Sequence, residues 1–198
     1  MNKTYEIIPS IASGNMLMLG QTIEELKGFN RLHLDIEDGN FVPNITFGIK
    51  TIQAISSVAT QLLDVHILAY HPERYIDQLS ECGVSNVAVH FETLKYPMEV
   101  LHQIHCMGMK AGLALNIATP VELIEPFVEK LDYILIMTSE PDGEGQIFCP
   151  SVLKKIKKAK KFVGKEIWVD GGIGEKELNL VEEAGADKII MGRGIFCK

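Results

Sequence analysis

The stretch from Arg31 to Gly39 combines residues that can bind a metal ion with the alternation of a β-strand. Period-2 geometry places His33, Asp35 and Glu37 on one face and three aliphatic side chains on the other. An imidazole and a carboxylate two residues apart on a strand can both reach one divalent ion. This stretch is therefore a candidate metal-binding strand.

Two more stretches carry similar residues. Asp64 and His66 form a second acid–imidazole pair on an apolar strand, and Asp170 ends the apolar run 167–170 just before two glycines. In a parallel sheet or barrel, the ends of such strands meet at one rim. The sequence therefore predicts a metal-centred active site at that rim.

Short apolar runs alternate with helical patterns along the whole chain. We predict strands at residues 5–10, 31–35, 62–68, 86–91, 111–115, 133–137, 167–170 and 188–191, and helices at 21–27, 50–58, 72–82, 98–107, 120–129, 150–161 and 175–184. Strand–helix units of about 20–25 residues favour parallel strands joined by crossover helices. No GxGxxG motif follows the first strand, so we expect a closed (β/α)8 TIM barrel rather than an open dinucleotide-binding sheet.

The length of 198 residues predicts one (β/α)8 barrel domain over residues 1–198. Such barrels commonly have about 250 residues, so this one is compact. Because only residues 193–198 follow the eighth strand, we expect the last helix to be truncated or absent.

Composition excludes several classes of partner. The chain has 19 Lys and Arg against 26 Asp and Glu, a formal charge of −7, which argues against a nucleic-acid partner. No apolar run reaches the roughly 18 residues of a membrane helix, and no signal-peptide pattern is present. The four cysteines are scattered without a CxxC motif, as in reduced proteins. We therefore expect a cytoplasmic protein that does not associate with membranes.

Polar residues gather at the predicted strand ends, where barrel enzymes place their active sites. They are Ser10, His33, Asp35, His66, His90, Asn116 and Asp170. A structural role, such as a cap, would explain any one of them, but their convergence on one rim favours a functional site. The lysine run at 154–161 is predicted to be the solvated face of a helix.

A series of short motifs follows in order along the chain. They are IPSIAS at 8–13, HLDIEDG at 33–39, FVPN at 41–44, DVH at 64–66, NIATP at 116–120, GQIF at 145–148, VDGGI at 169–173 and the ending at 192–196. Together they closely resemble the ribulose-phosphate 3-epimerase family. The resemblance extends from residue 7 to residue 196, and the run MTSEPDG at 137–143 is similar to a divergent, epimerase-like branch.

The resemblance implies an isomerase that binds a divalent ion, zinc first and otherwise iron, manganese or cobalt. By position, the implied metal ligands are His33, Asp35, His66 and Asp170, and the implied catalytic acid/base pair is Asp35 and Asp170. Substrate contacts are expected at Ser10, His66, Gly143, Gly145, Gly171, Gly172, Gly192 and Arg193.

The chemistry of such an enzyme agrees with these residue types. Inverting C3 of a 2-ketose removes a proton beside a carbonyl and returns one to the opposite face, and a cation stabilises the ene-diolate between these steps. Two carboxylates on opposite faces can act as general base and general acid. We expect a metal-dependent epimerase of a sugar phosphate, such as ribulose 5-phosphate or allulose 6-phosphate.

The loop at 140–146 departs from the family pattern, because Asp142 and Glu144 occupy positions where the family has glycines of a phosphate-binding loop. Glycine lets backbone N–H groups approach a phosphate, and two added carboxylates would weaken its binding. Arg193 stands where the family has serine. It either binds the phosphate or pairs with Asp142 or Glu144.

Glu37 stands where the family has a methionine. Strand parity points it inward, where it could alter selectivity or add a metal ligand; the alternative is a solvated loop carboxylate.

Two other functions stay open, namely the same chemistry on a non-phosphorylated or differently substituted sugar, and a non-catalytic sugar-phosphate-binding paralogue. The pair of Asp35 and Asp170 argues against the paralogue, because binding alone needs no opposed carboxylates. The resemblance also suggests a homo-oligomer, in which a second subunit could cover apolar surface left by the missing helix.

Overall fold

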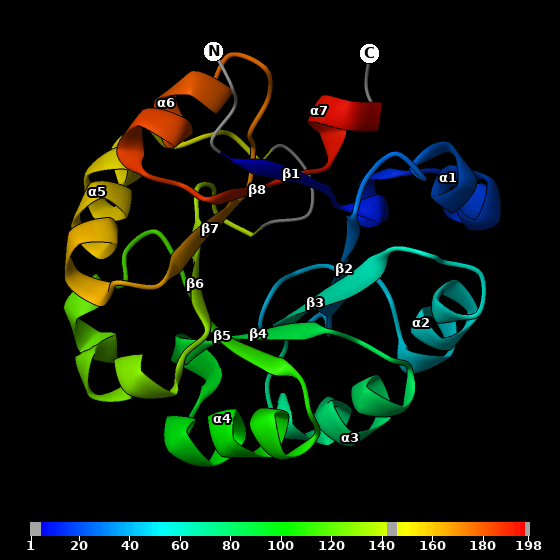
Figure 1. The fold of residues 1–198 in the computed structure, drawn as a ribbon, viewed down its shortest axis with the longest axis horizontal. Coiled ribbons are helices and arrows are strands. Elements are labelled where there is room, and N and C mark those ends of the chain that lie inside the picture. The colour runs from blue at the N-terminus through cyan, green and yellow to red at the C-terminus, as the bar shows by residue number, and fades with distance from the viewer. Residues whose placement is uncertain (1–4, 142–145, 197–198) are drawn as a thin grey trace.

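The computed structural model describes residues 5–141 and 146–196, which fold into a (β/α)8 barrel (Figure 1). Its strands are all parallel and pair in the order β1-β8-β7-β6-β5-β4-β3-β2. They are β1 (Glu6–Pro9), β2 (Arg31–Glu37), β3 (Leu62–Leu68), β4 (Asn86–His90), β5 (Lys110–Leu115), β6 (Tyr133–Met137), β7 (Glu166–Asp170) and β8 (Lys188–Met191). The predicted TIM barrel is thereby confirmed.

Helices surround the strands on the outside of the barrel (Figure 1). The α-helices are α1 (Leu19–Glu25), α2 (Ile49–Ser56), α3 (Glu73–Glu81), α4 (Pro97–Cys106), α5 (Val152–Val163), α6 (Leu178–Ala184) and α7 (Arg193–Phe196). The 3-10 helices are η1 (Ile11–Ser13), η2 (Met16–Met18), η3 (Phe91–Thr93) and η4 (Val121–Lys130). Within the described residues, α7 follows β8 as a helix of 4 residues.

The helix predicted at 120–129 is a 3-10 helix in the structure. Pro126 lies inside it, and proline has no N–H for a bond to the residue four positions earlier, whose carbonyl its ring would also crowd. The segment therefore winds more tightly than the helical pattern of its apolar residues predicted.

The strands separate two apolar cores. Side chains such as Leu34 and Ile67 point outward and pack against the helices, whereas Tyr133, Leu135 and Trp168 fill the barrel interior. Because both faces of each strand are covered, the strands are almost continuously apolar. Polar residues on the inner face are therefore exceptions that require partners.

The N-terminal end of the barrel interior is filled by a charged layer. Arg31 donates to Asp64 at 2.8 Å and to Asn86 at 3.2 Å, and Lys188 lies 3.0 Å from Glu166. Asp64 is thus one layer below His66, beside His33 in the strand register, and does not join the rim site. The prediction that Asp64 and His66 act as a pair is therefore wrong, because alternation fixes the face of a strand but not the depth in the barrel.

The seam of the barrel lies between β1 and β2. These strands form no ladder, and a single parallel bridge between Ser10 and His33 joins them within the described residues. The backbone N–H of Ser10 also donates to Met191 on β8 at 2.9 Å. The seam therefore closes at the level of the predicted site.

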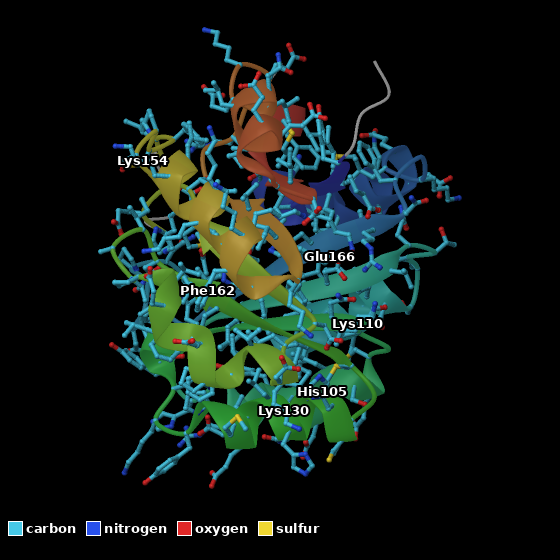
Figure 2. All side chains as sticks on the ribbon, turned by 60° about the vertical axis from the view of Figure 1, so that its left-hand side comes forward. His105, Lys110, Lys130, Lys154, Phe162 and Glu166 are labelled. Atoms are coloured by element: carbon cyan, nitrogen blue, oxygen red, sulfur yellow. The ribbon has the colours of Figure 1, made fainter. Side chains whose placement is uncertain are left out.

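The outer surface is polar over α5, where Lys154 points outward (Figure 2). The other lysines of the run 154–161 are exposed as well, except Lys155, which turns inward and donates to the backbone carbonyl of Asn116 at 2.6 Å. The prediction of a solvated lysine face therefore fails at this one residue. No helix among the described residues has the length and apolar character needed to cross a membrane.

Candidate metal and active site

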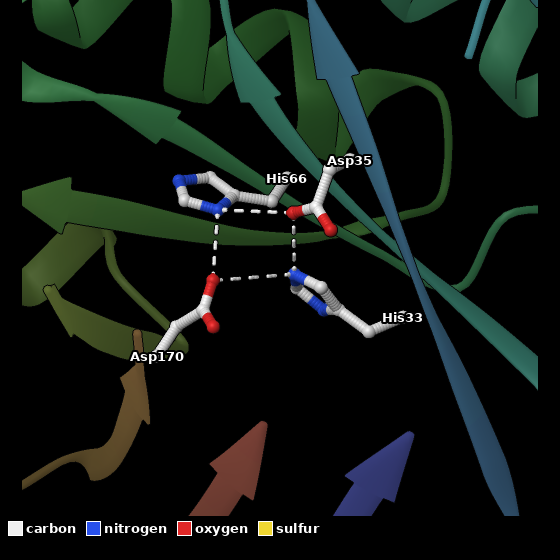
Figure 3. A group of neighbouring side chains, drawn as sticks. All are labelled: His33, Asp35, His66 and Asp170. Atoms are coloured by element: carbon white, nitrogen blue, oxygen red, sulfur yellow. Dashed lines mark ion pairs between the residues drawn. The ribbon is translucent and has the colours of Figure 1, made fainter. Parts of the chain in front are cut away.

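Four side chains from three strands converge at the C-terminal rim (Figure 3). The Nε2 atom of His33 lies 3.2 Å from Oδ1 of Asp35 and 4.0 Å from Oδ2 of Asp170. The Nδ1 atom of His66 lies 3.6 Å and 3.5 Å from the same two oxygens. One donor atom of each residue lies within 4.8 Å of the others. We call His33, Asp35, His66 and Asp170 the rim group.

The rim group fits a divalent cation. Both ring nitrogens of His33 and the Nδ1 atom of His66 are buried and have no hydrogen-bond partner among the described residues. Buried polar atoms without partners are rare, and a bound ion is one explanation for them. Two imidazole nitrogens and two carboxylate oxygens are also a donor set that suits zinc and related metals. The structure thus brings together all four side chains that the family resemblance implies as metal ligands.

Asp35 is held in place from two sides. The hydroxyl of Ser10 donates to its Oδ2 atom at 2.7 Å, which leaves Oδ1 facing the two histidines, and the hydroxyl of Thr46 donates to its backbone carbonyl. Burial would raise the pKa of Asp35, but His33 and then His66 outweigh burial and hold it well below its usual range. Asp35 is therefore a carboxylate at neutral pH.

His66 responds to the same charges. Burial lowers its pKa, but the carboxylates of Asp170 and Asp35, 3.5 Å and 3.6 Å from its Nδ1 atom, outweigh burial and raise the pKa to about 9. Without a cation, the ring is thus an imidazolium that neutralises the carboxylates. A cation would take over this role and displace the proton.

A glycine turn follows Asp170. Gly171 and Gly172 have φ values of 113° and 67°, which favour glycine. A Cβ atom on Gly172 would lie 2.7 Å from the backbone nitrogen of Phe148, and one on Gly171 would meet Ser139. This turn brings the backbone after β7 close to the loop that leads from β6 to α5.

A cavity of about 610 Å³ opens above the rim group. Seven of the predicted residues line it, namely Ser10, Asp35, Asp170, Gly171, Gly172, Gly192 and Arg193. His66, which was also predicted to contact substrate, is fully buried beside Asp35 and Asp170 and does not line it. Gly143 and Gly145, together with Asp142 and Glu144, lie outside the described residues.

Arg193 lies at one side of this cavity. Its Nη2 atom donates to the backbone carbonyl of Gln146 at 2.7 Å. The guanidinium therefore spans from the start of α7 to the end of the predicted phosphate loop, at the wall of the cavity.

Glu37 also lines the cavity, with 8% of its surface exposed. Its Oε2 atom accepts a hydrogen bond from Nδ2 of Asn44 at 2.7 Å. Burial and then the negative charge of Asp35 raise the pKa of Glu37 to about 7. The inward orientation predicted from strand parity is confirmed, and the alternative of a solvated loop carboxylate is wrong.

A second histidine–acid pair, His90 and Glu92, lies behind the rim group. The Nε2 atoms of His66 and His90 are 2.9 Å apart, and Nδ1 of His90 lies 3.1 Å from Oε2 of Glu92. Burial lowers the pKa of His90 to about 4, whereas hydrogen bonds from His90 and Thr119 outweigh burial and lower that of Glu92 to about 2. Sequence analysis placed His90 at a strand end but missed Glu92, although its spacing repeats that of His33 and Asp35.

The fold and the site together define a (β/α)8-barrel protein with a candidate metal centre at the C-terminal rim. The chain belongs to the ribulose-phosphate 3-epimerase family, because the model of the Ribulose-phosphate 3 epimerase family matches residues 6–196.

Curated relatives agree with this assignment. The ribulose-phosphate 3-epimerase of Schizosaccharomyces pombe is 38% identical over 96% of this chain and 86% of its own length. The ribulose-phosphate 3-epimerase of Bacillus subtilis is 38% identical over 96% of this chain and 92% of its own length. Among solved structures, a mutant tryptophan synthase α-subunit from Pyrococcus furiosus has a TM-score of 0.74 at 11% identity, covering 96% of this chain and 87% of that one. This last likeness concerns the fold alone.

Proposed function

We propose that the protein is a metal-dependent isomerase that inverts C3 of a ketopentose phosphate, with Asp35 and Asp170 as its acid/base pair. One observation carries the proposal: two carboxylates from separate strands, Asp35 on β2 and Asp170 on β7, face each other across the rim group beneath a cavity (Figure 3). A substrate carbon between them would present one face to each carboxylate.

In this mechanism each aspartate handles one proton. One carboxylate removes the C3 proton, and the other, in its protonated form, returns a proton to the opposite face. His33 and His66 lower the pKa of Asp35, so Asp35 is a weak base while these two histidines carry positive charge. A divalent cation bound by the rim group would supply stabilisation of negative charge on the sugar oxygens. We propose zinc first, with iron, manganese or cobalt as alternatives.

The glycines and Arg193 are proposed to bind the phosphate. Gly171, Gly172 and Gly192 line the cavity with backbone, and Arg193 adds a guanidinium that can hold two phosphate oxygens. Ser10, whose hydroxyl donates a hydrogen bond to Asp35, is proposed to contact the sugar part of the substrate.

Solvent-deuterium exchange at C3 tests the acid/base pair. Asp35→Asn and Asp170→Asn are each expected to lower the exchange rate by at least about 100-fold, since general acid–base groups commonly contribute that much. Asp38→Asn, on the same strand end but bonded to loop amides, serves as a control and should exchange normally. Normal exchange in both rim variants would remove the proposed roles.

Arg193→Ser tests the phosphate contact. If Arg193 binds phosphate, the variant should raise KM for a phosphorylated substrate about 10-fold or more with a smaller effect on kcat, because a charge-assisted bidentate contact is lost. The non-phosphorylated sugar is the control substrate, for which KM should not change. An unchanged KM for the phosphate would favour pairing of Arg193 with Asp142 or Glu144.

A second candidate, the same chemistry on a non-phosphorylated or differently substituted sugar, is favoured by the carboxylates of the 140–146 loop and by Glu37. A panel of pentulose and hexulose phosphates and their free sugars, followed by C3 exchange, distinguishes the two.

We further propose a cytoplasmic homo-oligomer. The described cysteines, Cys82, Cys106 and Cys149, are free, as expected in a reducing compartment. Leu17 is 95% exposed between two half-exposed methionines in η2, which supports contact with another subunit. Sedimentation of the wild type and of Leu17→Lys tests this assembly.

A further inference from the structure

His66 differs from the other rim histidine in having a built support. The ring of His66 contacts the ring of His90, and His90 in turn contacts Glu92. Both histidine rings are fully buried. The rings are stacked at 4.9 Å with an angle of 20°. His33 has no comparable partner on either nitrogen among the described residues.

The contact between the two Nε2 atoms constrains the protons. At 2.9 Å one nitrogen must donate and the other must accept, since two facing N–H groups would repel. A neutral imidazole that binds a cation through Nδ1 keeps its proton on Nε2. His66 can therefore act as a ligand only if the Nε2 atom of His90 is the acceptor.

Glu92 determines which nitrogen of His90 carries the proton. Its Oε1 atom already accepts from the backbone N–H of Asn116 at 2.8 Å and from the hydroxyl of Thr119. Its Oε2 atom faces Nδ1 of His90 at 3.1 Å, and a carboxylate can only accept there. The proton of His90 is thereby drawn to Nδ1, which leaves Nε2 free to accept from His66.

We propose that Glu92, acting through His90, is a positioning residue that fixes the tautomer and ring orientation of His66 and so presents its Nδ1 atom to a divalent cation. Lys155 extends this support, because it bonds the carbonyl of Asn116 at 2.6 Å and anchors the loop whose amide holds Glu92. Outer partners of metal-binding histidines act in this way in general, and their loss weakens metal binding by about 10- to 100-fold.

Glu92→Gln gives a sharp test. The donors at Asn116 and Thr119 should hold the amide oxygen of the new side chain, so that its NH2 group faces Nδ1 of His90 and reverses the tautomer. We expect the ¹⁵N NMR signals of His90 in metal-free protein to change from the Nδ1–H to the Nε2–H pattern. We also expect the Kd for Zn²⁺, measured by chelator competition, to rise about 10- to 100-fold.

Glu73→Gln is the matched control. His71 and Glu73 have the same spacing and the same Nδ1–Oε distance of 3.1 Å, but they are exposed and lie outside the rim group. This variant should keep the wild-type Zn²⁺ affinity. A Zn²⁺ affinity of Glu92→Gln equal to that of the control would overturn the proposal.

The wild type provides a test that needs no variant to fold. His90 in the zinc-loaded protein must show the Nδ1–H tautomer, and an Nε2–H tautomer would refute the proposal directly. Both readouts are independent of the sugar on which the protein acts, so that the proposed epimerase activity could fail while this inference stands.

Discussion

At the scale of single residues, the unusual group is Glu37, a carboxyl in a cavity wall that already contains two aspartates. Its pKa of about 7 lies above the ordinary value of 4.5, because burial and the charge of Asp35 disfavour ionisation. Between these two pH values the folded protein keeps a proton that the unfolded chain has released. The contribution of Glu37 to the free energy of unfolding of metal-free protein should therefore fall as pH rises through this window.

Glu37→Gln should remove this contribution, while those of Asp64 and His66 remain. The shift corresponds to about 3 kcal/mol, so urea unfolding between pH 4.5 and pH 7.5 should show a decrease in stability that is smaller in the variant by about that amount. Glu73→Gln, which changes an exposed glutamate, should retain the wild-type slope. Parallel pH profiles of the wild type and Glu37→Gln would contradict the prediction.

At the scale of elements, the turn after β7 fixes the position of Asp170 through contacts with the residues that follow β6. The backbone N–H of Thr138 donates to the carbonyl of Asp170 at 2.6 Å, and Gly171 packs directly against Ser139. β6 and β7 thus continue their pairing into the loops that shape the cavity.

Gly171→Ala is expected to lower the free energy of unfolding by about 3 kcal/mol and to weaken Zn²⁺ binding. The new Cβ must displace Ser139, and residue 171 has a φ of 113°, which alanine rarely adopts. Gly83→Ala is the control, since Gly83 has a φ of 69° but open space around its Cβ position. It should cost about 1 kcal/mol and leave Zn²⁺ affinity unchanged. If both variants changed the Zn²⁺ affinity equally, the prediction that the turn after β7 positions the rim group would be wrong.

Element patterns also define what the sequence could predict. Strand alternation identified the inward face of β2 and therefore the place of His33, Asp35 and Glu37, because side-chain direction follows from backbone geometry alone. Alternation carries no information on depth, and for this reason Asp64 was wrongly grouped with His66. Helical periodicity likewise could not separate Lys155 from its exposed neighbours, since its orientation depends on the carbonyl of Asn116, a contact 39 residues away.

At the scale of the whole molecule, the charged layer at the N-terminal end supports the barrel beneath the rim group. The side chain of Asp64 is 1% exposed and depends on Arg31 for its neutralisation. Burial outweighs Arg31 and raises the pKa of Asp64 to about 6. Burying these charges is therefore less favourable than apolar packing would be. Disrupting the layer should lower the free energy of unfolding rather than change binding at the rim group.

Arg31→Leu should destabilise the protein by about 3 kcal/mol at pH 7.5, because it leaves a buried carboxylate without its partner. The loss should shrink at pH 5, where Asp64 becomes protonated and neutral. Adding Asp64→Leu to this variant should restore much of the stability, as replacing a whole buried pair commonly does. These values can be read from urea unfolding, and a loss that is the same at both pH values would contradict the account.

The seam between β1 and β2 has a consequence for how the molecule holds together. The ladder of backbone hydrogen bonds runs around the barrel and stops at this seam, while the rim group takes its donors from β2, β3 and β7. A cation bound by these residues would link β7 to β2 and β3, and so would join the two sides of the seam at the C-terminal rim. Cation binding would then stabilise the closed barrel, and the backbone amides of β1 and β2 should be the first to gain protection from hydrogen exchange.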